Sequence, residues 1–324
     1  MTCSHQYRHY GLAVEANVAL PGLPETEFGS PDVRIEVTRA RERPQVDRTW
    51  TAIGAPTGAW RAPAGAGSRL RLQFEGVAGA WGDFLIDDRG ETVRLTLDES
   101  SDLDDACELL IASVFSCVLA QRGLTCLHAS VVAIEDRVIA LVGAKGAGKS
   151  TLALALARRG GRLLSDDVAA VSLHDGVCGV AVGRAALRMR PDSAASLGAG
   201  FTALRPVWAS APASLGKRYY EAGELACTSA PRRLPLAGLF LLAPRGRAAT
   251  PEVRSVTPGE LLPALLANRH MAVVLDRAGH RRDFACLGAL VRSVPGCELV
   301  RPDDLGTVPD VADAVLRAAE KWTI

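Results

Sequence analysis

The stretch "LVGAKGAGKSTLALALARRGGRLLSDDVAAV", from Leu141 to Val171, decides the fold. Its segment Gly143–Ser150 fits the phosphate-loop pattern GxxxxGK[ST] without gaps. The residues before it, Arg137–Val142, are almost wholly apolar, as in a central buried strand, and a helix is expected from Lys149 to Arg159. The stretch therefore predicts an α/β domain with a nucleotide bound between a strand and a helix.

The residue types of this loop suit a phosphate chain. Its glycines let successive backbone N–H groups point at phosphate oxygens, and the following helix adds its positive N-terminal end. Lys149 supplies a mobile charge for the β and γ phosphates, and the Ser150 hydroxyl can be a ligand of Mg²⁺. The chain has only four lysines, and Lys145 and Lys149 both lie in this loop, so a chance match is improbable.

Two adjacent carboxylates, Asp166 and Asp167, follow on the strand expected after the helix. At a strand end both can turn towards one ligand, where one holds a metal and the other accepts a proton from an incoming hydroxyl. A solvated acidic turn is the alternative, and spacing alone does not decide between them. His128 lies near the start of the preceding strand, where a structural role is more common than a catalytic one. His270 and the "GHRRDF" segment are interpreted as structural or surface features.

Further cations stand downstream. Arg184, Arg188 and Arg190 alternate along an expected strand and so share a face, which could hold phosphate or an anionic peptide end, or could simply be solvated. Lys217 and Arg218 stand in a segment rich in small residues, which is interpreted as a mobile loop. Such a loop can bring cations to a transferring phosphoryl group.

Composition narrows the class of protein. Hydrophobic residues make up 48% of the 324, and the net charge is +1 from 37 basic and 36 acidic residues. A large core is therefore possible, while neither nucleic acid nor a membrane is expected as a partner. The eight cysteines show no zinc-finger spacing, and neither a membrane-spanning run nor a signal peptide is recognisable. We expect a reduced, cytoplasmic protein.

The chain is expected to contain two parts. Residues 1–100 alternate apolar and polar residues with period two, as in "PDVRIEVTRA", and predict a β-rich N-terminal module. The segment "TGAWRAPAGAGS" within it is interpreted as a connection. Residues 101–324 are expected to form the catalytic domain, beginning with a linking helix at about 101–122 that Ser100 or Ser101 caps.

The motifs "LHAS" and "LVGAKGAGKSTLALALARRGGRLLSDDVAAV" together resemble the catalytic domain of HPr kinase/phosphorylase. The chain is more similar still to the HPr-kinase-like proteins of lasso-peptide and other peptide biosynthetic clusters. "YRHYGLAVEANVALPGLPE", "GKRYY" and "LPLAGLFLLAP" also look like their sequences. The resemblance is specific from Leu127 to Val171 and diffuse over most of the remaining chain. It implies a fold of the HPr-kinase and phosphoenolpyruvate-carboxykinase type.

The resemblance also implies roles for single residues. Asp166 would help Ser150 to hold Mg²⁺, Asp167 would be the base for the acceptor hydroxyl, and His128 would lie near the transferred phosphoryl group. Lys217 and Arg218 would assist as catalytic cations. HPr kinase has an acidic residue at the position of Thr151, and its dephosphorylation signature is not recognisable around Val180–Arg190. The residues expected to contact ATP are Gly143, Ala144, Lys145, Gly146, Ala147, Gly148, Lys149, Ser150 and Thr151.

The sequence therefore predicts an ATP- and Mg²⁺-dependent kinase that phosphorylates a serine hydroxyl of a peptide or protein. A precursor peptide of a ribosomal natural product is the most specific acceptor expected. An ATP-binding regulatory module and a small-molecule kinase are the alternatives. A homo-oligomer is possible, and the sequence leaves the oligomeric state open.

Overall fold

The computed structural model describes residues 4–53, 58–63, 70–76, 80–196, 198, 204–209, 216–226, 233–246 and 248–322. The internal contacts divide the chain into two units. The first is Met1–Leu124 with Val207–Leu215 and Met271–His280, and the second is Thr125–Pro206 with Gly216–His270 and Arg281–Ile324. The helical stretch after residue 100, which the sequence assigned to the second domain, groups by its contacts with the first unit.

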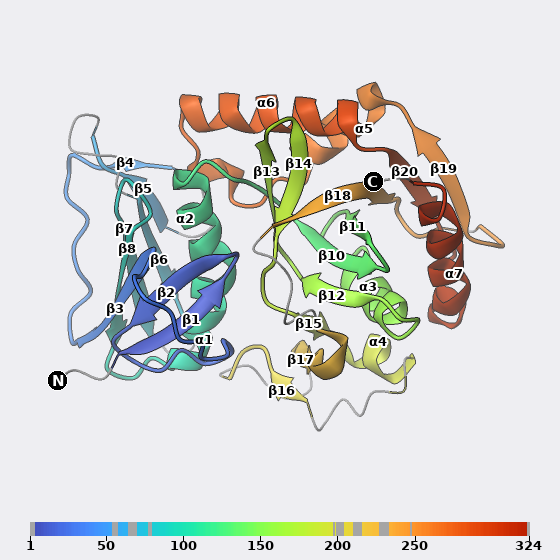
Figure 1. Ribbon diagram of the computed structural model, residues 1–324. Coiled ribbons are helices and arrows are strands. Elements are labelled where there is room, and N and C mark those ends of the chain that lie inside the picture. The colour runs from blue at the N-terminus through green and yellow to red at the C-terminus, as the bar shows by residue number, and fades with distance from the viewer. Residues whose placement is uncertain are drawn as a thin grey trace. The chain divides into compact units, whose positions relative to one another are not determined.

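The first unit contains an eight-stranded sheet in the order β1-β2-β3-β8-β7-β6-β5-β4 (Figure 1). Its strands are β1 His5–His9, β2 Leu12–Ala16, β3 Val33–Ala40, β4 Thr51–Ala52, β5 Gly58–Arg61, β6 Leu70–Glu75, β7 Trp81–Ile86 and β8 Thr92–Asp98. The period-two stretch "PDVRIEVTRA", residues 31–40, contains β3, whereas β5 lies inside the stretch interpreted as a connection.

Helical segments follow this sheet: α1 Leu103–Leu109, a π-helical turn Leu110–Val114 and α2 Phe115–Gln121. The ring of Phe115 packs 4.6 Å from that of His9 on β1, which explains why these helices group with the N-terminal strands. Asp102, and not Ser100 or Ser101, caps α1, because its side chain accepts from the backbone N–H of Asp104.

The second unit is mixed α/β, and its main sheet has the order β12-β10-β11-β18-β14-β13-β9, with β20 pairing β18 and β19 pairing β20. Within it β11, β18 and β20 are parallel neighbours. The strands are β9 Thr125–Leu127, β10 Ala129–Ile134, β11 Arg137–Val142, β12 Arg162–Ser165, β13 Ala169–His174, β14 Val177–Ala181, β18 Arg233–Leu242, β19 Glu252–Val256 and β20 Gly296–Val300. A small sheet joins β15 Ala186–Met189, β17 Arg218–Glu221 and β16 Arg205–Pro206.

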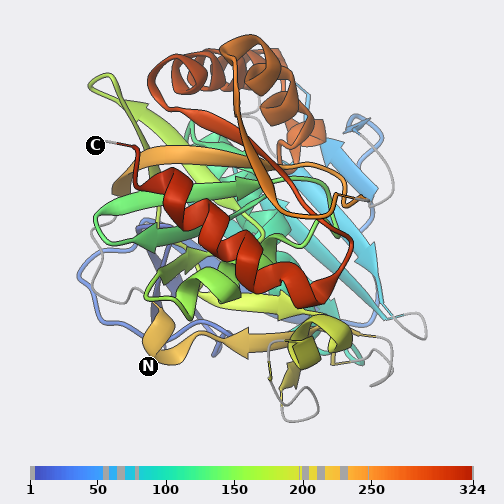
Figure 2. The same cartoon turned by 90° about the vertical axis from the view of Figure 1, so that its right-hand side faces the viewer.

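Helices cover both faces of the main sheet. α3 Lys149–Ala157 and α7 Val308–Ala319 lie side by side on one face (Figures 1 and 2). Residues of α5 Pro258–Ala267 and α6 Arg277–Ser293 pack on the other. α4 Pro191–Ser196 follows β15, and the sequence analysis did not anticipate α6, β19 or β20.

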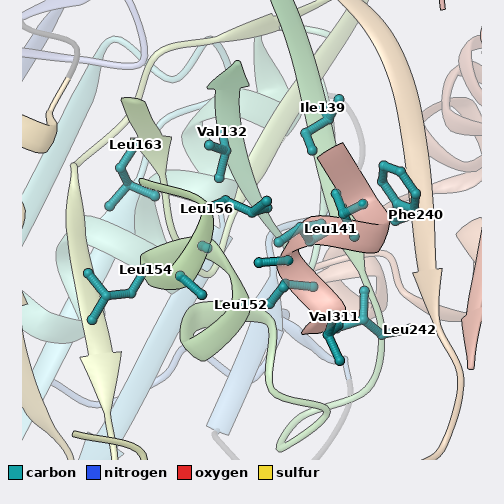
Figure 3. Close-up of a cluster of buried hydrophobic side chains, with 14 of the residues drawn as sticks. Val132, Ile139, Leu141, Leu152, Leu154, Leu156, Leu163, Phe240, Leu242 and Val311 are labelled. Atoms are coloured by element: carbon teal, nitrogen blue, oxygen red, sulfur yellow. The ribbon is translucent and has the colours of Figure 1, made fainter. Parts of the chain in front are cut away.

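Alternation along β11 assigns its side chains to two cores. Ile139 and Leu141 point to the α3 side, in the cluster of Figure 3, whereas Val138 and Ala140 point to the α5 side. This alternation is what a strand buried on both faces requires. It fixes β11 firmly, and the phosphate loop begins directly at its carboxyl end.

Within the described ranges no helix is both long and apolar enough to cross a membrane. Six cysteines in those ranges are outside disulfides, and five of them are buried. The segment 209–231, interpreted as a mobile loop, contains β17 and a 3₁₀ turn, Gly223–Leu225, and its residues 210–215 and 227–231 lie outside the described part.

Candidate functional site

The phosphate loop lies where the carboxyl ends of β11, β18 and β20 meet, the edge at which open α/β sheets bind ligands. Gly146 and Gly148 have φ angles of 85° and 90°, a left-handed conformation that favours glycine. A Cβ atom at either position would meet nothing within 4 Å, so these two turns of the loop border open space. The loop thus has both the backbone shape and the room that a phosphate chain needs.

The Lys149 side chain folds back over this loop and is 5% exposed. Its Nζ donates to the carbonyl oxygens of Gly143 over 2.7 Å and Ala144 over 3.0 Å. Burial lowers the pKa of Lys149 to about 8, although Asp166 and Asp167 pull it upwards. The group is therefore still mostly protonated at pH 7, with its charge held at the loop.

Ser150 and Asp166, the two residues expected to hold a metal, contact each other. The Ser150 hydroxyl lies 2.9 Å from Oδ2 of Asp166. The Ser130 hydroxyl also donates to this carboxylate. The antiparallel pairing of β10 with β12 sets Val131 opposite Ser165, so Ser130 before the one lies close to Asp166 after the other. Within the described ranges no three His, Cys, Asp or Glu side chains gather as a ready-made metal site. Ser150 and Asp166 fit Mg²⁺, which takes few protein ligands beside phosphate and water.

Asp167 contacts different side chains from those that Asp166 contacts. Its φ is 73°, a left-handed conformation that costs a non-glycine residue energy and is often found at functional sites. Nη1 of Arg188 donates to its Oδ2 over 2.9 Å, and Nδ1 of His128 lies 3.3 Å from its Oδ1. Burial on its own would raise the pKa of Asp167, but Arg188 and His128 hold it below its ordinary value. The carboxylate is therefore ionised at neutral pH.

The strand expected over residues 162–173 is in fact interrupted at this pair. β12 ends at Ser165 and β13 begins at Ala169. Residues inside a regular strand would point to opposite faces, whereas the break lets both carboxylates reach one edge of the sheet. The sequence analysis predicted that both carboxylates could reach one ligand at a strand end, but it gave one continuous strand and not this break.

His128 lies between β9 and β10, and a second histidine stands beside it. The backbone N–H of His128 donates to the carbonyl of Asn268, and that of His270 donates to the carbonyl of Cys126. The two rings are 6.1 Å apart. Burial lowers the pKa of both, that of His270 to about 4, so both rings are neutral at pH 7. His270, interpreted from the sequence as a structural or surface feature, is buried beside His128, and no sequence spacing signals this contact.

Lys217 and Arg218, the two cations of the segment rich in small residues, have different partners. Burial lowers the pKa of Lys217, while the charges of Asp166 and Asp167 oppose that shift, so Lys217 faces the carboxylate pair. The side chain of Arg218 donates instead to the carbonyl of Leu204 over 2.6 Å. The charges of both aspartates thus act on Lys217, whereas the side chain of Arg218 contacts Leu204.

Arg184, Arg188 and Arg190 have different surroundings. Arg188 on β15 reaches Asp167, and its Nε also donates to the Tyr219 hydroxyl over 3.3 Å. The Arg184 guanidinium lies over the Tyr219 ring, 4.0 Å from its centroid. Arg190 is exposed. Arg184 and Arg188 thus both contact Tyr219, whereas Arg190 is exposed, so the three arginines do not act as one group.

Arg301, which the sequence analysis did not consider, supports the phosphate loop from β20. It is 6% exposed and donates to the carbonyl oxygens of Ala147 in the loop and, over 3.0 Å, of Ala243 beyond β18. Burial lowers its pKa to about 10, which leaves it charged at neutral pH. It ties the loop to two neighbouring strands, and a lone Arg after an apolar strand gives no sequence signal of that role.

No protein-family model matches the chain, and neither does any curated protein sequence. Among solved structures, the Hpr(Ser) kinase/phosphatase from Coxiella burnetii is similar, with a TM-score of 0.33 and 13% identity. That match covers 60% of this chain and 97% of the other. Similarity at this level does not assign a function, which must be argued from the site itself.

Proposed function

We propose that this protein is a kinase that uses ATP and Mg²⁺ to phosphorylate a serine hydroxyl of a peptide or protein. The observation that carries the proposal is that Asp166 and Asp167 contact different side chains. Asp166 is bonded to Ser150 of the phosphate loop, while Asp167 faces His128 and Arg188. One carboxylate thus serves the nucleotide side, and its neighbour is left for an acceptor.

Nucleotide binding would use the loop as the structure presents it. The backbone of Gly143–Ser150 would hold the phosphates, and the Lys149 ammonium would exchange the Gly143 and Ala144 carbonyls for phosphate oxygens. Ser150 and Asp166 would hold Mg²⁺, which neutralises charge on the phosphates.

Transfer would then require one proton acceptor and one attacking oxygen. Asp167 accepts the proton of the serine hydroxyl as its oxygen bonds to the γ-phosphorus and the bond from that phosphorus to the β-γ bridging oxygen breaks. The products are a phosphoserine and ADP. Lys217 and Lys149 place positive charge beside the carboxylates, where the phosphoryl oxygens develop charge. Neutral His128 orients Asp167 through its Nδ1 contact.

The acceptor class that we propose is a precursor peptide of a ribosomal natural product, phosphorylated in the cytoplasm. Its support is the sequence resemblance described above. To test it, the protein is incubated with γ-labelled ATP, Mg²⁺ and each short peptide encoded beside its gene. We expect one peptide to gain a phosphate and the label.

The other outcomes separate the alternatives. Tight ATP binding without transfer to any peptide, protein or metabolite would favour a regulatory module. Transfer to a metabolite, with all peptides left unlabelled, would favour a small-molecule kinase. Failure to bind ATP at all would contradict the role of the phosphate loop.

A further inference from the structure

We propose that Arg188 is the positioning residue of this site, which locks the two carboxylates in different directions. The inference rests on the proposed function, and it adds a residue for which the sequence left open either phosphate binding or a solvated face. Arg188 contacts both aspartates at once. Its backbone N–H donates to Oδ2 of Asp166 over 3.1 Å, and its Nη1 donates to Oδ2 of Asp167 over 2.9 Å.

These two contacts have different consequences. The backbone bond holds Asp166 beside Ser150, because it engages the same oxygen, Oδ2, that Ser150 contacts. The side-chain bond occupies Oδ2 of Asp167 and leaves Oδ1 on the side of His128. Nδ1 of His128 lies 3.0 Å from the backbone carbonyl oxygen of Asp167 and 3.3 Å from Oδ1, so Oδ1 has the looser of the two side-chain contacts and is the oxygen that we assign to the hydroxyl proton.

The Arg188 guanidinium also contacts Tyr219. Tyr219 on β17 accepts from Nε of Arg188, and the antiparallel pairing of β15 with β17 sets Arg188 directly opposite Tyr219. The Tyr219 ring is 2% exposed and lies beneath the guanidinium of Arg184. Arg188 thus has a fixed support, and its fork can serve Tyr219 and Asp167 together, which a lysine ammonium on a flexible stem does less well.

Arg188 also sets the charge balance of the site. Lys149 and Lys217 also act on Asp166 and Asp167 by charge, and in the proposed reaction both lysines are needed for phosphate oxygens. A carboxylate held in place by a fixed cation need not swing onto those lysines. Positioning of this kind has a large effect on the reaction rate, since misplacement of a reacting group by about 1 Å can lower the rate on the order of 100-fold.

The test compares Arg188→Ala, Arg188→Lys and the control Arg162→Ala. Arg162 is exposed at the start of β12, the end remote from the aspartates. We measure ADP release from MgATP, with the acceptor peptide where one is found and with water otherwise, and we measure ATP binding by calorimetry. Thermal melting of each variant checks that it folds, and the crystal structure of Arg188→Ala shows the Asp167 side chain directly.

We expect kcat of Arg188→Ala to fall on the order of 100-fold, with the KM for ATP changed much less. Added methylguanidinium should restore part of kcat in that variant only. Arg188→Lys should fall in between, and Arg162→Ala should match the original protein. In the crystal, the Asp167 carboxylate of Arg188→Ala should leave its position beside His128.

Two results would overturn the assignment. One is a kcat that stays within about twofold in Arg188→Ala, and the other is an Asp167 side chain that keeps its orientation without the guanidinium. If the original protein itself turns over no ATP, the proposed function fails, and the crystal structure still decides whether Arg188 positions Asp167.

Discussion

The hydroxyl of Ser150 lies 2.9 Å from Oδ2 of Asp166, so the last residue of the phosphate loop and the first of the two carboxylates form one unit. This contact joins residues on α3 and after β12, and it supports the proposal that Asp166 is the carboxylate that helps to hold Mg²⁺. Its effect on nucleotide binding should therefore depend on the metal.

Replacing Asp166 by Asn should weaken ATP binding by about tenfold or more in the presence of Mg²⁺, because a ligand charge is lost. In EDTA the affinities of variant and original protein should be similar. Calorimetry with and without Mg²⁺ measures both. An equal loss in the two conditions would show that Asp166 acts on the loop fold and not on a metal.

Lys149→Met should lower ATP affinity by roughly tenfold to a hundredfold, since a charge-assisted hydrogen bond contributes about 1.5–3 kcal/mol. Methionine keeps the length of the buried side chain, so the loop should still fold. Lys145→Met is the comparison, because that side chain is exposed and should matter less. An equal loss of ATP affinity in both variants would contradict a direct contact between Lys149 and the phosphates.

Stability should fall in mild acid because of His270. Its pKa is about 4 in the folded protein, whereas its ordinary value is 6.5. Between these values the unfolded chain binds more protons, so the free energy of unfolding decreases as pH falls from 6.5 towards 4. His270→Gln should make this decrease smaller, as denaturant titrations at pH 7 and pH 5 can measure. The same decrease in the variant and the original protein would contradict the burial of this ring.

Arg301→Met should destabilise the second unit, since it leaves the carbonyl groups of Ala147 and Ala243 without this donor. An unsatisfied buried polar group costs about 1–3 kcal/mol, which should be visible as a lower melting temperature. ATP should also bind less tightly, because the loop loses its tie to β18 and β20. Unchanged melting and unchanged affinity together would show that the tie is dispensable.

Much of this site was predictable because its signals are local. The loop Gly143–Ser150 specifies its own backbone through glycines and through the strand and helix around it. The almost wholly apolar run of β11 likewise predicts a strand buried on both faces. The spacing of Asp166 and Asp167 from the loop made them candidates, although spacing alone did not decide between a site and a solvated turn.

The rest depends on contacts that are distant in sequence. Arg188, His270 and Arg301 reach the site only because β15, the segment after α5 and the end of β20 converge there. No spacing relates them to the phosphate loop. The break between β12 and β13 was also invisible, because the apolar pattern continues on both sides of it.

The central claim is that Asp167 is the proton acceptor, and Asp167→Asn tests it most directly. Asparagine keeps the shape of the side chain and removes the negative charge. We expect ATP binding in calorimetry to be retained and transfer of label from γ-labelled ATP to the acceptor peptide to fall by about 100-fold to 10,000-fold, the range of general base catalysis. Transfer at the rate of the original protein would contradict the claim.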